Sequence, residues 1–157
     1  MMPVQFMVFV LVAGSGRPPG KDRGHLYEGL FFSRLGVFKP IKIVGKYALD
    51  VLLENSDPEL VKLEVDVYWV KHGGDDPVAR MTRLGQRVVA LHLKDMAAGP
   101  DQKFAEVGTG ILDFKAILAA AEKTGAKYGA VEQDETYGTP PLDAIRTSFE
   151  NLKKLGA

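Results

Sequence analysis

Hydrophobic residues follow two different spacings in the part of the chain after Tyr47. In residues 61–70 they alternate with polar residues, which is typical of a strand with one buried face. Further strands are expected over 87–95, which contains a β-branched, apolar run, and over 127–134. Around these segments the spacing becomes helical. Four helices are expected. The first begins near Tyr47, the second runs from Asp76-Pro77 to about Leu84, the third covers 112–125, and the last extends from about Pro140 to Leu155. This order predicts successive right-handed βα units on a parallel sheet, and therefore an α/β fold.

Capping residues give the expected helix boundaries. Asp57-Pro58 and Asp76-Pro77 each supply an N-cap residue followed by a proline suited to a first helical turn, and Gly125 is the expected C-terminal stop. Four apolar residues of the last helix are in register and are expected to face inward. They are Leu142, Ile145, Phe149 and Leu152.

The first 46 residues have a weaker pattern. The apolar run at 6–13 is too short to span a bilayer and has no basic segment before it, so we expect a buried strand, with a secretory signal as the alternative. Residues 14–25 are rich in glycine, proline and charge and predict a loop, in which Ser15 and Asp22 break the spacing of a phosphate-binding P-loop. Residues 26–45 have no clean period and remain unassigned.

Composition narrows the expected partners. The 157 residues include 20 basic and 20 acidic side chains, so the formal net charge is zero and no general attraction to nucleic acid is expected. The chain has no cysteine, which excludes a disulfide framework and a cysteine zinc site. We expect a cytoplasmic globular protein with no nucleic-acid or membrane partner.

Three polar residues close the three expected strands, at the rim where parallel sheets bind ligands. Asp66, His92 and Glu132 are each separated by enough chain for one βα unit, so their side chains can converge. Singly, they have ordinary alternatives: a turn former, a satisfied core histidine and a surface carboxylate. Two carboxylates and an imidazole together suit Mn²⁺, Mg²⁺, Co²⁺ or Zn²⁺ better than a soft metal, and predict a divalent-metal site.

Four consecutive motifs resemble those of the sugar phosphate isomerase/epimerase family. They are "LEVDVYWVKHGGDDPV", "RVVALHLKDM", "EVGTGILDF" and "AVEQDE", and the resemblance runs from about Tyr47 to the C-terminus. It implies a xylose isomerase-like (β/α)8 TIM barrel. Because a complete barrel takes about 250 residues, we expect a partial barrel over 47–157, roughly a C-terminal half, preceded by a divergent segment over 1–46.

The resemblance also implies a reaction and a ligand set. Asp66, His92 and Glu132 would take the places of the family's aspartate, histidine and second glutamate ligands to a divalent metal, with Mn²⁺ favoured. The family's chemistry is isomerisation or epimerisation of a sugar or sugar phosphate, by proton abstraction next to a carbonyl through a metal-stabilised enediolate. Glu132 would also serve as the acid/base group.

Other residues of these motifs are candidates for contact with the substrate. Lys94 is a catalytic or substrate-binding candidate, with a solvated ion pair to Asp95 as the alternative. Trp69 and His72 are candidates for binding substrate, and Trp69, with its neighbour Tyr68, could equally pack in the core.

The loop "VGTG" at 107–110 precedes a helix, so its backbone N–H groups could meet a polar substrate end. A turn with Asp113 capping the helix is the favoured alternative.

The resemblance leaves one ligand without a counterpart. The family's first glutamate should lie upstream of Tyr47, where no motif for it is found, and Glu28 and Glu54 are the nearby candidates. Because an open half-barrel exposes strand edges, we expect a homodimer or larger homo-oligomer. The alternative function is a catalytically inactive half-barrel that binds metal or sugar without turnover.

Overall fold

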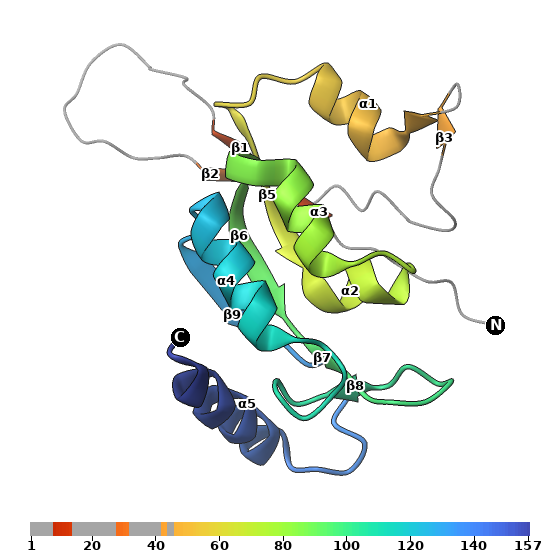
Figure 1. Ribbon diagram of the computed structural model, residues 1–157, viewed down its shortest axis with the longest axis vertical. Helices are drawn as coiled ribbons and strands as arrows, with labels where there is room; N and C mark the ends of the chain where they lie inside the picture. Colours follow the sequence, from red (N-terminus) through yellow and green to blue (C-terminus); the bar gives the residue numbers. More distant parts are fainter. Residues whose placement is uncertain (1–7, 14–27, 32–41, 44–45) are drawn as a thin grey trace.

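The computed structural model describes residues 8–13, 28–31, 42–43 and 46–157 of the chain. A five-stranded sheet in the order β2-β1-β5-β6-β9 runs through it (Figure 1). β5 (Val61–Asp66), β6 (Val88–Leu93) and β9 (Tyr128–Val131) are parallel to one another. β1 (Val8–Ala13) pairs antiparallel with β5, and β2 (Glu28–Phe31) pairs antiparallel with β1. The parallel βα units confirm the expected α/β partial barrel.

Helices connect the parallel strands. α2 (Val67–His72), α3 (Pro77–Leu84) and the 3-10 turn η1 (Gly85–Arg87) lead from β5 to β6, α4 (Phe114–Thr124) leads from β6 to β9, and α5 (Pro141–Leu155) follows β9. α1 (Ala48–Glu54) precedes β5, and two short antiparallel pairs are β3 (Lys42–Ile43) with β4 (Lys46–Tyr47) and β7 (Asp95–Met96) with β8 (Phe104–Ala105). In Figure 1, α3 and α4 lie over one face of the parallel strands.

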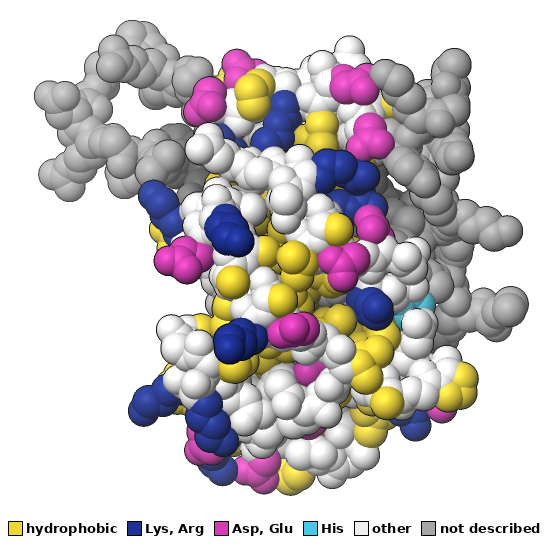
Figure 2. Space-filling view, in the orientation of Figure 1, with side chains coloured by type: hydrophobic (Ala, Val, Ile, Leu, Met, Phe, Trp, Pro, Cys, Tyr) yellow, Lys and Arg dark blue, Asp and Glu magenta, His cyan; other side chains and the backbone are white. Residues whose placement is uncertain are grey.

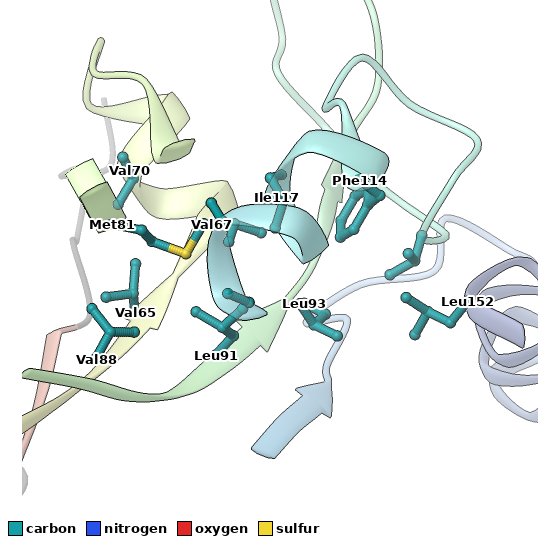
Figure 3. Packing of buried hydrophobic residues seen from close by; sticks show 13 residues of the cluster. Val65, Val67, Val70, Met81, Val88, Leu91, Leu93, Phe114, Ile117 and Leu152 are labelled. Carbon is teal, nitrogen blue, oxygen red and sulfur yellow. The ribbon is translucent and has the colours of Figure 1, made fainter. Parts of the chain in front are cut away.

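The hydrophobic core lies between this face of the sheet and the helices (Figure 3). Val65 of β5 is paired in register with Leu91 of β6, and both are buried there with Ile117 of α4. Because side chains alternate along a strand, the next pair in the ladder, Asp66 with His92, faces the opposite side. The sheet thus separates an apolar core from a polar face.

The strand expected over 61–70 is shorter in the structure than the alternating pattern of the sequence suggested. β5 ends at Asp66, and α2 begins at Val67. The Asp66 carboxylate accepts a hydrogen bond from the Trp69 N–H at 3.0 Å, which satisfies one of the free donors of the first helical turn. An N-cap residue at the end of a strand therefore converts a pattern of period two into a helix.

The two Asp-Pro pairs have different outcomes. Asp76 caps α3 as expected, accepting from the Ala79 N–H at 2.7 Å, and Gly125 ends α4 with a left-handed φ of 81°. Asp57-Pro58 does not start a helix: the Asp57 side chain accepts from the Glu59 N–H at 2.8 Å in a turn that leads into β5. The same side chain can cap a helix or close a turn, and the chain that follows decides between them.

α5 has the expected range but not the expected inward face. Leu152 is buried, but Leu142, Ile145 and Phe149 are 76%, 54% and 62% exposed. The helix packs inward through Ala144, Ser148 and Leu152. Polar bonds fix this orientation, because the Ser148 hydroxyl accepts from the Val107 N–H at 3.0 Å and the Asn151 amide donates to the Val107 carbonyl at 2.8 Å.

On the molecular surface seen in Figure 2, lysine and arginine side chains are interspersed with aspartate and glutamate. Among the described residues, no helix is long and apolar enough to cross a membrane. The run at 6–13, expected to be a strand, contains β1. Glu28 lies in β2, but its side chain is not among those that the structure describes.

Candidate metal centre

Three adjacent strands bring Asp66, His92 and Glu132 together. Asp66 ends β5 opposite His92 of β6, and Glu132 directly follows β9, the strand on the other side of β6. One ligand atom from each of the three side chains lies within 4.8 Å of the others. Parallel pairing thus brings together residues that are far apart in sequence, as their positions at the ends of the expected strands predicted.

The three ligand atoms face a common point. His92 Nδ1 lies 2.9 Å from a Glu132 carboxylate oxygen and 3.6 Å from Asp66 Oδ2. The two carboxylate oxygens of Asp66 have different contacts: Oδ1 caps α2, and Oδ2 faces the imidazole of His92. A helix cap therefore holds this ligand in position.

Glu64 is a functional candidate that was not recognised in the sequence. Its carboxylate lies 2.9 Å from Nε2 of His92, the ring nitrogen on the far side from Asp66 and Glu132. An N–H on Nε2 bonded to Glu64 leaves Nδ1 to face the ligand cluster, which is how outer carboxylates orient metal-binding histidines. Glu64 is two residues before Asp66 on one strand, so period-two alternation was the available signal.

The carboxylates also determine the charge of the imidazole. Burial by itself lowers the pKa of His92, but the hydrogen bonds and charges of Asp66 and Glu64 outweigh it and raise the pKa to about 9. The ring is therefore protonated at neutral pH when no metal is bound, and a metal ion would replace a proton on Nδ1.

Lys94 brings a positive charge to the same cluster. Its side chain is 1% exposed, and its ammonium lies 2.9 Å from Glu132, 3.0 Å from Asp134 and 3.4 Å from Asp66. Burial lowers the pKa of Lys94, but these carboxylates outweigh it and raise the pKa above its usual value. Lys94 is therefore an ammonium that can donate hydrogen bonds, and its solvated-pair alternative with Asp95 is wrong.

The donor set fits a divalent ion. Asp66 Oδ2 and Glu132 Oε2 are buried, and both face the side chains of His92 and Lys94. Buried carboxylate oxygens of this kind are stabilised by a cation. Two oxygens and one imidazole nitrogen suit a hard or borderline metal.

An aromatic wall stands beside the cluster. The Trp69 and Phe104 ring centroids are 6.0 Å apart, and the Lys94 ammonium lies 5.9 Å and 5.8 Å from them. Tyr68 is buried behind this wall, where burial raises its pKa to about 12, and its hydroxyl donates to the Gln102 carbonyl. The structure thus places Trp69 next to Lys94 and Tyr68 in the core.

His72, the other expected substrate-binding residue, lies at the C-terminal end of α2. Its ring centroid is 5.2 Å from that of Trp69 and 5.7 Å from that of Tyr68. Burial lowers its pKa. The metal-ligating group found among the described residues does not include His72, which lies beside the aromatic wall and remains a predicted substrate-binding residue.

Asp95 has a structural task that the sequence did not reveal. Its fully buried carboxylate accepts hydrogen bonds from the backbone N–H groups of Met96, Gly108, Gly110 and Leu112, at 2.7 to 3.1 Å. The N–H groups of Gly108 and Gly110 are therefore not available to a substrate, and that hypothesis for the "VGTG" loop is wrong. The favoured alternative is confirmed, since Asp113 caps α4 by accepting from the Ala116 N–H at 3.0 Å.

The missing glutamate ligand is not found within the described residues. Glu54 is the last residue of α1, and the group of metal-ligating side chains there contains only Asp66, His92 and Glu132. The side chain of Glu28, in β2, is not described. The described chain therefore supplies three of the four ligands that the resemblance implies.

Replacing Glu64 by Gln is expected to weaken Mn²⁺ binding about 10- to 100-fold, the usual effect of losing an outer partner of a metal-binding histidine. Isothermal titration calorimetry measures it. The control is Glu59→Gln, an exposed change just before β5 that should leave the affinity unchanged. Equal affinities in the Glu64→Gln variant and the unmodified protein would remove the orienting role of Glu64.

Comparison with known proteins agrees with this architecture. No family model and no curated protein matches the chain. Two solved structures described as sugar phosphate isomerase/epimerase from Parabacteroides distasonis match with 28% and 29% identity and TM-scores of 0.59 and 0.58, over 72% and 69% of this chain. A structure of IOLI protein with a binding zinc atom, at 19% identity and a TM-score of 0.52 over 69% of this chain, shares the fold.

The chain spans only 38%, 36% and 41% of the lengths of these three proteins. The expected resemblance to the family, and its restriction to part of a barrel, are both confirmed.

Proposed function

We propose that this chain is a divalent-metal-dependent sugar or sugar-phosphate isomerase or epimerase, with Mn²⁺ as the favoured ion. The observation that carries the proposal is the convergence of Asp66, His92 and Glu132 from three parallel strands. The similarity to isomerase/epimerase structures gives independent support.

The chain's own groups suit proton transfer next to a carbonyl. A divalent ion held by Asp66, His92 and Glu132 would polarise the carbonyl oxygen and stabilise the negative charge that develops on it. Glu132 keeps a partly exposed side chain at the rim, so its carboxylate can accept the proton from the carbon next to the carbonyl. Lys94 remains charged beside it and can hydrogen-bond a substrate oxygen. Trp69 and Phe104 exclude water from one side.

Solvent deuterium incorporation into the substrate, followed by NMR, tests this step across a panel of ketoses and their phosphates. With saturating Mn²⁺, Glu132→Gln is expected to slow exchange by about 10² to 10⁴, the usual effect of losing a general base. Glu135→Gln, an exposed change in the same loop, is the control and should exchange normally. Binding without exchange in the unmodified protein would instead favour the alternative, a half-barrel that binds metal or sugar without turnover.

We also propose that two copies of the chain associate. The three exposed side chains of α5, Leu142, Ile145 and Phe149, form an uncovered apolar face, and β9 is an edge strand of the sheet. Together they would supply a large part of the roughly 800 Å² that each partner buries in a stable interface. Zero net charge produces no general repulsion between copies.

Light scattering after size-exclusion chromatography is expected to give a dimer. Phe149→Arg should give a monomer because it places a charge in the contact, whereas Glu150→Arg, the next exposed position on α5, should remain dimeric. A monomeric unmodified protein would end this proposal.

A further inference from the structure

The space around the candidate metal centre is lined with carboxylates. Asp134 and Glu64 join the ligands Asp66 and Glu132 through contacts with Lys94 and His92. Lys94 already contacts three of these carboxylates, and His92 would be a neutral ligand once a metal is bound. The Lys94 ammonium is not free to neutralise an additional anion without losing those contacts.

The loops next to the site also contain more carboxylates than cationic side chains. Residues 94–113, after β6, and 132–140, after β9, contain seven carboxylates and two lysines. Barrels that bind phosphate often do so with the loops after consecutive strands and a helix N-terminus. The second lysine, Lys103, is exposed, with its ammonium 5.2 Å from the Tyr137 ring centroid. A single hydrated surface ammonium is a weak site for a phosphate dianion.

Among the described residues, backbone donors do not compensate for this shortage of cations. The N–H groups of Gly108, Gly110 and Leu112 are bonded to Asp95. The N-terminus of α2 is capped by Asp66 and that of α4 by Asp113, so a carboxylate occupies the place where an anion would bind. In the described chain, the helix ends and the glycine loop beside the site are thus already satisfied.

The remaining surface suits hydroxyl groups and C–H faces. Trp69 and Phe104 form an apolar wall close to the Lys94 ammonium, which also contacts the partly exposed carboxylates of Glu132 and Asp134. A sugar ring presents C–H groups that pack on aromatic rings and hydroxyl groups that donate to carboxylates.

We propose that the site takes an uncharged polyhydroxylated carbonyl compound, such as a free ketose, and discriminates against the phosphate ester of the same compound. The inference rests on the proposed function and narrows its substrate class. The four carboxylates exceed by one the three positive charges of a bound divalent ion and Lys94. This excess negative charge would repel the dianionic phosphate, because the low dielectric of a half-buried site screens the repulsion poorly.

Saturation-transfer NMR on the full chain loaded with Mg²⁺ tests the proposal, and avoids the broadening that free Mn²⁺ would cause. The probes are matched pairs, D-fructose with its 6-phosphate and D-ribulose with its 5-phosphate. At least one free ketose is expected to bind tenfold or more tightly than its ester. Trp69→Ala should reduce saturation of the ring C–H protons, whereas Lys103→Gln should leave binding of the free ketose unchanged.

Two results would overturn the proposal. The first is tighter binding of an ester than of its free ketose that is lost in Lys103→Gln, which would show that Lys103 creates a phosphate site. The proposed function would still stand in that case if deuterium exchange depended on Glu132. Absence of binding by every free ketose would also overturn it. If exchange were absent as well, the proposed function would fail with it.

Discussion

Asp95→Ala is expected to lower the free energy of unfolding by about 3 to 5 kcal/mol, a large part of the stability of an ordinary domain. The substitution removes the acceptor of four backbone N–H groups, of which that of Met96 is buried and the other three bonds are partly buried. The loop over 107–112 would lose its tie to β7, and α5 would be loosened because it is bonded to Val107.

Urea denaturation followed by circular dichroism measures this effect in the metal-free protein. Asp101→Ala is the matched control, since Asp101 is exposed in the adjoining loop and should change stability little. Gly110→Ala tests the same arrangement independently, because an added Cβ would collide with the Met96 carbonyl and the Asp95 carboxylate. A change below about 1 kcal/mol for Asp95→Ala would contradict the structural role.

His92→Ala is expected to abolish stoichiometric Mn²⁺ binding, since it removes the nitrogen ligand and leaves only two carboxylates facing the Lys94 ammonium. The loss should exceed the about 10- to 100-fold effect of removing an outer partner. Native mass spectrometry reports metal stoichiometry and subunit number in one experiment.

His72→Ala is the control for this substitution. It removes a histidine of the aromatic wall, outside the ligand group, and should keep one metal per chain. If the unmodified protein bound no metal, or if both variants bound it equally, the metal centre and the enzymatic proposal would have to be abandoned.

Much of the site could be predicted from the sequence because it depends on local patterns. Apolar β-branched runs predict strands, and the residue that closes each parallel strand lies at the ligand-binding rim. That reasoning was sufficient for Asp66, His92 and Glu132, which the structure brings together. The motif resemblance added the partial barrel, which the comparisons confirm.

Contacts between segments distant in sequence decided the remaining features. The inward face of α5 follows from Ser148 and Asn151 bonding to a loop more than 40 residues away, so hydrophobic periodicity alone selected the wrong side. Asp95 reads as one member of a charged pair until its bonds to the glycine loop are seen.

The sequence by itself determined the α/β class, the βα order and the positions of the three candidate ligands, because strand and helix periods and capping residues act over a few neighbouring residues. The tertiary structure alone decided that Glu64 lies beside Nε2 of His92 and that Lys94 is buried among carboxylates. Those properties depend on distances across neighbouring strands and on burial, which arise only when the sheet is assembled.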